Sequence, residues 1–187
     1  LAGYLSFLVA DAIPLMIGVS TSAEQLRNII DSYNPKYIFL PTSRQGEVEG
    51  EEYSTCFSGY SLLDTHCHDV VVHDKLALLL GTSGSTGSPK YVRLSHDNVL
   101  SNAQSIVKYL DLNSGELPVT TLPPSYSYGL SIIHSHLLAG ATIAVTNKTF
   151  FDREFWDYLR EVKATSFGGV PYHYEMLKKL RFTKMDL

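Results

Sequence analysis

The sequence predicts an α/β fold, in which a layered, largely parallel sheet is flanked by helices. Short apolar runs with strand character alternate with longer stretches whose apolar residues recur at helical spacing. The run at residues 76–80 is continuously apolar, as expected for a strand that is covered on both faces. Alternating strands and helices are the order that builds parallel sheets.

The first part of the chain is expected to form a helix at residues 1–11, a strand at 13–18, a second helix and a strand at 36–40. Thr21 and Glu24 have the spacing of a capping box for the second helix. The apolar stripe of this helix consists of Leu26, Ile29, Ile30 and Tyr33, and the helix ends at Asn34-Pro35. This strand, helix, strand unit favours a parallel sheet.

The middle of the chain is expected to contain a hairpin and two strands that flank a glycine-rich loop. The hairpin covers residues 52–64, with β-rich runs on either side of Ser58-Gly59. The two strands lie at 76–80 and 91–94. Ser95 then caps a helix. The expected buried face of that helix consists of Val99, Ala103, Ile106, Val107 and Leu110.

The last third of the chain alternates regularly between the two kinds of element. Strands are expected at 119–122, 142–146 and 165–168, and helices at 130–139, 152–162 and 171–180. Pro171 suits the first turn of the last helix, where its missing N–H costs nothing.

The composition is that of an ordinary globular domain and excludes several classes of function. The 187 residues are 44% hydrophobic and 18% charged, and the net charge is -4. This charge offers no basic surface for nucleic acid, and the apolar runs are too short to cross a membrane. The only cysteines, Cys56 and Cys67, fit a reducing compartment. We therefore expect a cytoplasmic protein that binds neither nucleic acid nor membrane.

The loop between the strands at 76–80 and 91–94 combines residue types that suit a polyphosphate. It reads Thr82, Ser83, Gly84, Ser85, Thr86, Gly87, Ser88, Pro89 and Lys90. Glycines let consecutive amides face one anion, hydroxyls add donors and the lysine adds positive charge. The loop is neither a Walker A motif nor a GxGxxG fingerprint, because both of those open a helix. A solvated Ser/Gly linker is the alternative, which the buried strand before the loop disfavours.

This loop, followed by Val92 and by Ser95-His96, resembles the signature of the AMP-forming acyl-CoA synthetases, peptide-synthetase adenylation domains and luciferases. The resemblance covers essentially the whole chain and implies part of the large N-terminal domain of an adenylate-forming enzyme. It assigns binding of the ATP phosphates to Thr82, Ser83, Gly84, Ser85, Thr86, Gly87 and Lys90. One departure is visible, because Tyr91 stands where the family usually has glycine.

Residues 122–129 with 137–141, and residues 168–171, resemble the family segments beside the acyl pocket. The resemblance assigns this pocket to Tyr126, Ser127, Gly168 and Gly169. Tyr126 and Tyr128 could also be core aromatics with their hydroxyls at a wet edge, and we favour a pocket role for the first and this core role for the second. Ser127 occupies the position where amino-acid-activating relatives carry an aspartate. Because a buried ammonium without a carboxylate partner is costly, we expect an acyl, aryl or hydroxy acid substrate.

The resemblance implies an ATP-dependent ligase that uses Mg²⁺ to form an acyl-adenylate and pyrophosphate. The acyl group would then pass to CoA or to the phosphopantetheine of a carrier protein. The chain starts inside a predicted helix without an initiator methionine, so we interpret residues 1–187 as a single partial domain. The family's catalytic lysine and C-terminal lid domain would lie beyond it, and this fragment alone is expected to be inactive. The alternative is a non-catalytic nucleotide- or anion-binding module, or a degenerate relative.

Two groups of histidine and cysteine residues carry no prediction of a metal site. The first consists of Cys56, His66, Cys67, His68 and His73, whose spacing does not fit a tetrahedral zinc site. The second is His134 and His136, which lie two positions apart on a helix and therefore point in different directions. The sequence does not identify the acid, the thiol acceptor or the oligomeric state.

Overall fold

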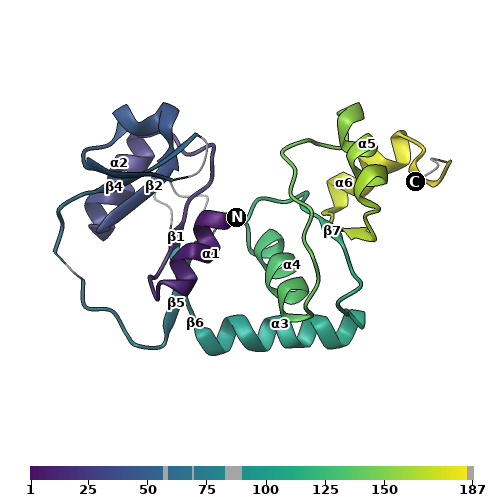
Figure 1. The fold of residues 1–187 in the computed structure, drawn as a ribbon, viewed down its shortest axis with the longest axis horizontal. Coiled ribbons are helices and arrows are strands. Elements are labelled where there is room, and N and C mark those ends of the chain that lie inside the picture. The colour runs from purple at the N-terminus through teal and green to yellow at the C-terminus, as the bar shows by residue number, and fades with distance from the viewer. Residues whose placement is uncertain (57–58, 69, 83–89, 185–187) are drawn as a thin grey trace.

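The computed structural model describes residues 1–56, 59–68, 70–82 and 90–184, which form small sheets surrounded by helices (Figure 1). The helices are α1 (Ala2–Val9), α2 (Ala23–Tyr33), α3 (His96–Leu110), α4 (Ser127–Leu138), α5 (Arg153–Val162) and α6 (Pro171–Lys179), with 3₁₀ helices η1 (Thr42–Glu47) and η2 (Phe182–Lys184). The strands are β1 (Leu15–Met16), β2 (Tyr37–Pro41), β3 (Glu51–Cys56), β4 (Tyr60–Asp64), β5 (Leu76–Gly81), β6 (Tyr91–Ser95), β7 (Pro118–Val119) and β8 (Ser166–Phe167).

The strands form mixed sheets. The first has the order β1-β5-β6, in which β5 pairs in parallel with β1 and antiparallel with β6. The second has the order β2-β4-β3 and is antiparallel throughout. The third pairs β7 with β8 in parallel, and a further parallel bridge joins Val119 to Ala144. The predicted α/β class with flanking helices is confirmed, and so is the predicted hairpin, which is β3-β4.

The expectation that the opening strand, helix, strand unit belongs to one parallel sheet is wrong for β2. β2 pairs antiparallel with β4, with Phe39 opposite Leu62. Residues at alternate positions of both strands are buried, and Ile38, Leu40 and Leu63 form one core cluster. The hairpin therefore offers β2 a partner whose apolar face matches its own, since side chains alternate between the two faces of a strand.

The predicted helices are all present, with three differences in detail. The capping box of α2 is formed by Ser22 and Gln25, one residue after the predicted Thr21 and Glu24. α4 begins at Ser127, earlier than predicted. Of the expected buried face of α3 only Ala103 is buried, and Leu110 is 54% exposed.

All three strands predicted in the last third are shorter than expected, and the one expected at 165–168 is the two-residue β8. The strand expected at 119–122 is the two-residue β7, and the region 142–146 contributes only the bridge at Ala144. The core of this region comes instead from helix α5, through Phe155, Trp156 and Leu159. Because α5 supplies much of the core here, the short strands β7 and β8 serve mainly to align the segments that follow them.

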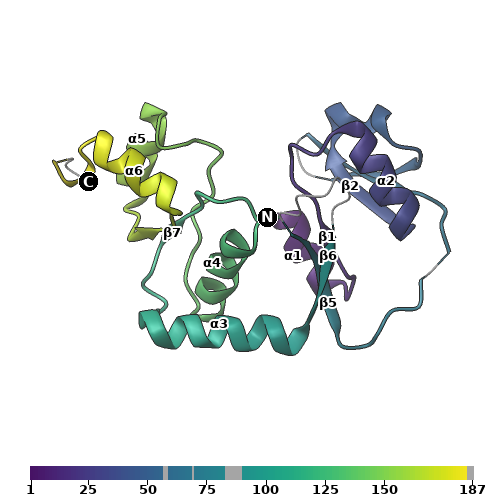
Figure 2. The same cartoon turned by 180° about the vertical axis from the view of Figure 1, so that it is seen from behind.

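Helix α3 connects the two parts of the molecule. It follows β6 and runs beneath α4, so that the part with β1 to β6 and the part with α4 to α6 are joined along it (Figures 1 and 2). Leu130 of α4 packs in one cluster with Tyr4, Leu78 and Leu80, so α4 also contacts the first part directly.

Candidate nucleotide and acyl site

The base of the predicted phosphate loop is closed by hydrogen bonds. The amide of Thr82 donates to the carbonyl oxygen of Lys90 at 3.0 Å, and the hydroxyl of Thr82 donates to the same oxygen at 3.2 Å. Gly81 pairs with Tyr91 in the antiparallel ladder just before this closure. Ser83, Gly84, Ser85, Thr86 and Gly87 lie outside the described residues, so their assignment stays a prediction. The two ends of the loop are nevertheless fixed on a buried strand.

The Lys90 side chain fits the predicted role of a phosphate ligand. The residue is exposed, and within the described part of the chain its ammonium takes part in no ion pair. An ammonium without a carboxylate partner is available to a polyphosphate, for which lysine acts as a point charge. The charge of this donor suits the triphosphate of ATP.

Tyr91, the departure from the family pattern, packs beside the base of the loop. Its ring lies 5.5 Å from the ring of Tyr33 in an edge-to-face arrangement. A Cβ atom on Gly81 would lie 3.4 Å from the Tyr91 ring. Burial, and in second place the neighbouring Tyr33, raise the pKa of the Tyr91 phenol. The aromatic ring thus covers the sheet and is not directed into the closure between Thr82 and Lys90.

The loop base and the predicted acyl segment lie at the same edge of the first sheet. Met16 pairs in parallel with Leu80, so Gly18 and Thr82 each follow a paired residue by two positions. The carboxyl ends of parallel strands meet at one edge of a sheet. A Cβ atom on Gly18 would lie 3.8 Å from the Ser125 hydroxyl oxygen. β1 therefore places the residues that follow it at the same edge as Thr82 and near the segment that leads to Tyr126.

Residues 123–126 form a turn that leads directly into α4. The amide of Tyr126 donates to the carbonyl oxygen of Pro123 at 3.0 Å, and Tyr126 is the N-cap of α4. A Cβ atom on Gly129 would lie 2.4 Å from the Pro123 carbonyl oxygen. Because Gly129 has no side chain, α4 can approach this turn closely. The close approach fixes the positions of Tyr126 and Ser127.

The two segments predicted to form the acyl pocket meet at Gly168. A Cβ atom there would lie 2.2 Å from Cδ1 of Ile132 and 3.6 Å from Cζ of Tyr128. The hydroxyl of Thr121 donates a hydrogen bond to the carbonyl oxygen of Gly168. Gly169 is buried beside Tyr174. The start of α4 and the corner before α6 therefore share a boundary, as the pocket prediction requires.

Tyr126 and Tyr128 are both partly exposed, at 45% and 40%. The interpretation of Tyr128 as a core aromatic is therefore wrong, because it borders Gly168 at the surface. Ser127 is also exposed, as the first residue of α4. The end of the helix that carries Ser127 bears a positive partial charge, which favours an anion over an ammonium.

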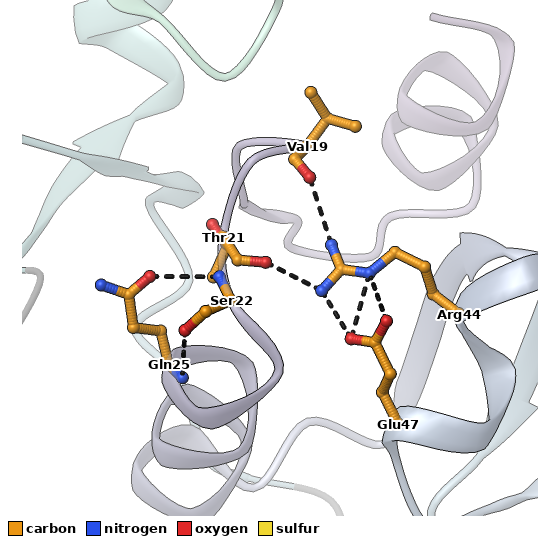
Figure 3. Close-up of polar contacts among 6 residues, drawn as sticks. All are labelled: Val19, Thr21, Ser22, Gln25, Arg44 and Glu47. Carbon is orange, nitrogen blue, oxygen red and sulfur yellow. Dashed lines mark hydrogen bonds and ion pairs between the residues drawn. The ribbon is translucent and has the colours of Figure 1, made fainter.

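Arg44 is a residue that the sequence reasoning missed. Its guanidinium lies between Glu47 of η1 and the turn after β1, where it donates to the carbonyl oxygens of Val19 and Thr21 (Figure 3). The spacing of Arg44 and Glu47, three residues apart, was the available signal. Gly18 and Thr121 were missed as well, since only the fold brings them beside the predicted acyl segments.

The histidines and cysteines form no metal centre in the described part of the chain, where no group of three or more potential ligands comes together. His134 instead accepts or donates a hydrogen bond with the Tyr4 hydroxyl at 2.7 Å, and His136 contacts the Ile132 carbonyl oxygen at 2.8 Å. Among the described residues, none of the helices has the length and apolar character that crossing a membrane requires.

Comparison with known proteins gives a family and a fold. Residues 1–186 match the family described as AMP-binding enzyme. Luciferin 4-monooxygenase of Nipponoluciola cruciata is 31% identical over 61% of this chain and 21% of its own length. Peroxisomal OPC-8:0-CoA ligase 1 of Arabidopsis thaliana is 38% identical over 54% of this chain and 19% of its own length. The matched part of this chain thus spans about a fifth of each relative.

The fold of the chain is also found in solved structures. o-Succinylbenzoate CoA synthetase of Bacillus subtilis, in complex with its acyl-adenylate intermediate, superimposes with a TM-score of 0.73. The match covers 95% of this chain and 47% of that protein, at 15% identity. At this identity the likeness shows the fold alone.

Proposed function

This chain belongs to the AMP-binding enzyme family, and on that basis we propose that it is part of an ATP-dependent ligase that activates a carboxylic acid. The substrate carboxylate attacks the α-phosphorus of ATP, the bond to the β-phosphate breaks, and pyrophosphate leaves. A thiol then attacks the acyl carbon, loses its proton and releases AMP. The relative named as a CoA ligase supports this reaction class.

The observation that carries the proposal is the common sheet edge of the loop base and the acyl segment. Thr82 and Lys90 close the base of the loop, and at the same sheet edge the position of a Cβ atom on Gly18 lies 3.8 Å from the Ser125 hydroxyl oxygen. Adenylate formation needs a carboxylate and a polyphosphate held next to each other, since positioning supplies a large part of the rate. The phosphates of ATP would lie on the loop from Thr82 to Lys90. When bound, Mg²⁺ supplies charge neutralisation of the phosphates.

The substrate is proposed to be an acid without an α-ammonium group. Ser127 offers no negative charge, and it lies at the helix end that favours anions. Tyr126, Ser127, Gly168 and Gly169 are proposed to border its pocket. CoA is the proposed acceptor, and the phosphopantetheine of a carrier protein is the alternative.

We further propose that residues 1–187 are a single partial domain, that a C-terminal lid domain with the family's catalytic lysine completes the active site, and that the chain alone is inactive. The relatives support this, because this chain covers only part of their length. The content of two cysteines supports a cytoplasmic location.

ATP–pyrophosphate exchange by the full-length protein tests the function. Wild type is assayed with acetate, hexanoate, palmitate, benzoate and a set of amino acids. We expect exchange with at least one acid that lacks an α-amino group. Lys90→Met should lower the exchange rate about a hundredfold, because it removes one preorganised charge that stabilises the transition state. Lys108→Met, on the exposed side of α3, is the matched control and should leave the rate unchanged.

A non-catalytic nucleotide- or anion-binding module gives a different result. It would bind ATP, as measured by calorimetry, and would show no exchange with any acid. Strong exchange with α-amino acids alone would contradict the substrate class and leave the ligase assignment in place.

A further inference from the structure

The turn after β1 is held in place by one side chain. Nη1 of Arg44 donates to the Val19 carbonyl oxygen at 3.2 Å, and Nη2 donates to that of Thr21 at 2.8 Å. The Thr21 amide donates to the Gly18 carbonyl oxygen at 3.1 Å, which closes the turn on itself. Val19 is 81% exposed and Ser20 is exposed. Because burial does not fix the turn, the hydrogen bonds of Arg44 carry that role.

Arg44 is itself fixed by Glu47. Nε donates to the two carboxylate oxygens at 3.0 and 3.1 Å, and Nη2 donates to Oε2 at 2.6 Å. The hydrogen bond from Arg44 lowers the pKa of the Glu47 carboxyl, so the carboxylate stays ionised at neutral pH. The five N–H donors of a planar guanidinium are spread over three nitrogens and can reach a carboxylate and two carbonyl groups that lie apart, whereas the three donors of lysine share one nitrogen.

The turn forms a surface that faces the predicted acyl segment. Around the position of a Cβ atom on Gly18, the hydroxyl oxygens of Ser125, Thr21 and Ser20 lie at 3.8, 3.9 and 4.0 Å. Ser125 belongs to the turn that leads into α4 through Tyr126. The hydroxyls of two separate chain segments therefore gather beside the start of α4.

We propose that Arg44 is a positioning residue, which holds the turn of residues 18–21 as a wall of the carboxylate side of the active site, beside Ser125. This inference rests on the proposed ligase function and adds to it a residue outside the loop and the acyl segments. Arg44 contacts the turn and Glu47, and it acts on the substrate only through the turn. Loss of Arg44 should therefore weaken binding of the acid more than binding of ATP.

Steady-state kinetics of the full-length protein test the proposal, with the acid from the panel above that wild type uses best. For Arg44→Met we expect the KM for the acid to rise about tenfold with little change in kcat, the signature of lost binding. The KM for ATP should stay within about twofold of wild type. Arg44→Lys keeps the charge and one hydrogen bond, so its KM for the acid should rise only about threefold.

Two further variants complete the experiment. Arg153→Met removes an arginine that is 90% exposed and pairs with Asp157 on α5, and it should change neither KM. Ser125→Val removes the hydroxyl beside the turn of residues 18–21 and leaves Arg44 unchanged. It should raise the KM for the acid. If Arg44→Met does not fold, Arg44→Lys and Ser125→Val decide the question, because both must raise the KM for the acid.

The proposal is overturned if folded Arg44→Met keeps the wild-type KM for the acid, or if both KM values rise equally. Wild-type KM values in both Arg44→Lys and Ser125→Val would overturn it too. Absence of exchange by wild type with every acid is a different result, because it contradicts the proposed function itself.

Discussion

The hydroxyl oxygen of Tyr4 lies 2.7 Å from Nε2 of His134, so one hydrogen bond joins α1 to α4 across 130 positions of the chain. Tyr4 is only 6% exposed and packs against Leu78, Leu80 and Leu130. Burial raises the pKa of Tyr4 to about 12 and lowers that of His134. At neutral pH both groups are therefore uncharged. The pair fixes α4, whose first turn carries Ser127, to the rest of the molecule.

Tyr4→Phe should lower the free energy of unfolding by about 1–2 kcal/mol, because it removes a hydrogen bond and leaves His134 without this partner. Urea unfolding at pH 7 measures the change. Tyr109→Phe, at a residue that is 87% exposed, is the control and should leave the stability unchanged. Equal stability of Tyr4→Phe and wild type would show that the hydrogen bond contributes nothing.

The stability should also depend on pH through His134. Its pKa in the folded state lies below the ordinary value of 6.5, because burial disfavours the charged imidazolium. The stabilisation is complete above pH 6.5 and is lost as the pH falls through the lowered pKa. Unfolding measured between pH 7 and pH 5 should therefore show falling stability. The His134→Gln variant cannot take up this proton, so its stability should depend less on pH. If the slope of stability against pH is unchanged in this variant, other groups cause the dependence.

Gly129→Ala should destabilise the protein by about 1–3 kcal/mol, since its Cβ atom would overlap backbone atoms that cannot rotate away. The nearest atoms are the carbonyl oxygens of Pro123 at 2.4 Å and Leu122 at 2.9 Å. Gly46→Ala is the matched control, because no atom lies within 4 Å of its Cβ position. Thermal unfolding of both variants tests the difference, and similar midpoints would argue against close packing of α4 on residues 122–123.

Ser95→Ala should cost about 1 kcal/mol, the usual value of an N-cap. The Ser95 hydroxyl accepts a hydrogen bond from the Asn98 amide at 3.1 Å, and the Asn98 side chain accepts one from the Ser95 amide at 3.1 Å. Ser105→Ala, within the same helix, removes only a bond to the Ser101 carbonyl oxygen and serves as the control. Urea unfolding that ranks Ser105→Ala as the more harmful change would contradict the role of the cap.

Signals that act within a few residues could be interpreted from the sequence alone. Ser95 caps α3, Pro171 opens α6 and Asn34 ends α2 with a φ of 43°, as their residue types predict. The strand at 76–80 was also recognisable, because its apolar run needs cover on both faces. The assignment of residues 83–87 to phosphate binding came from the same kind of local pattern and remains a prediction outside the described residues.

The start of α2 shows where local signals end. Thr21 with Glu24 and Ser22 with Gln25 both have the spacing of a capping box. The chain uses the second pair, while the Thr21 carbonyl oxygen accepts a hydrogen bond from Arg44. The local spacing alone does not decide between these two pairs, and the residue left outside the cap contacts a residue 23 positions away.

The sequence by itself determined the family, the α/β class and the order of the helices, because those depend on motifs and on the spacing of apolar residues. Only the tertiary structure decided that β2 pairs with β4, and that Gly18 meets Ser125 beside the base of the loop. A strand edge can form hydrogen bonds with any other strand, so its partner is selected by which apolar faces can be buried together. The wall that Arg44 holds exists for the same reason, since its groups come from segments that only packing brings together.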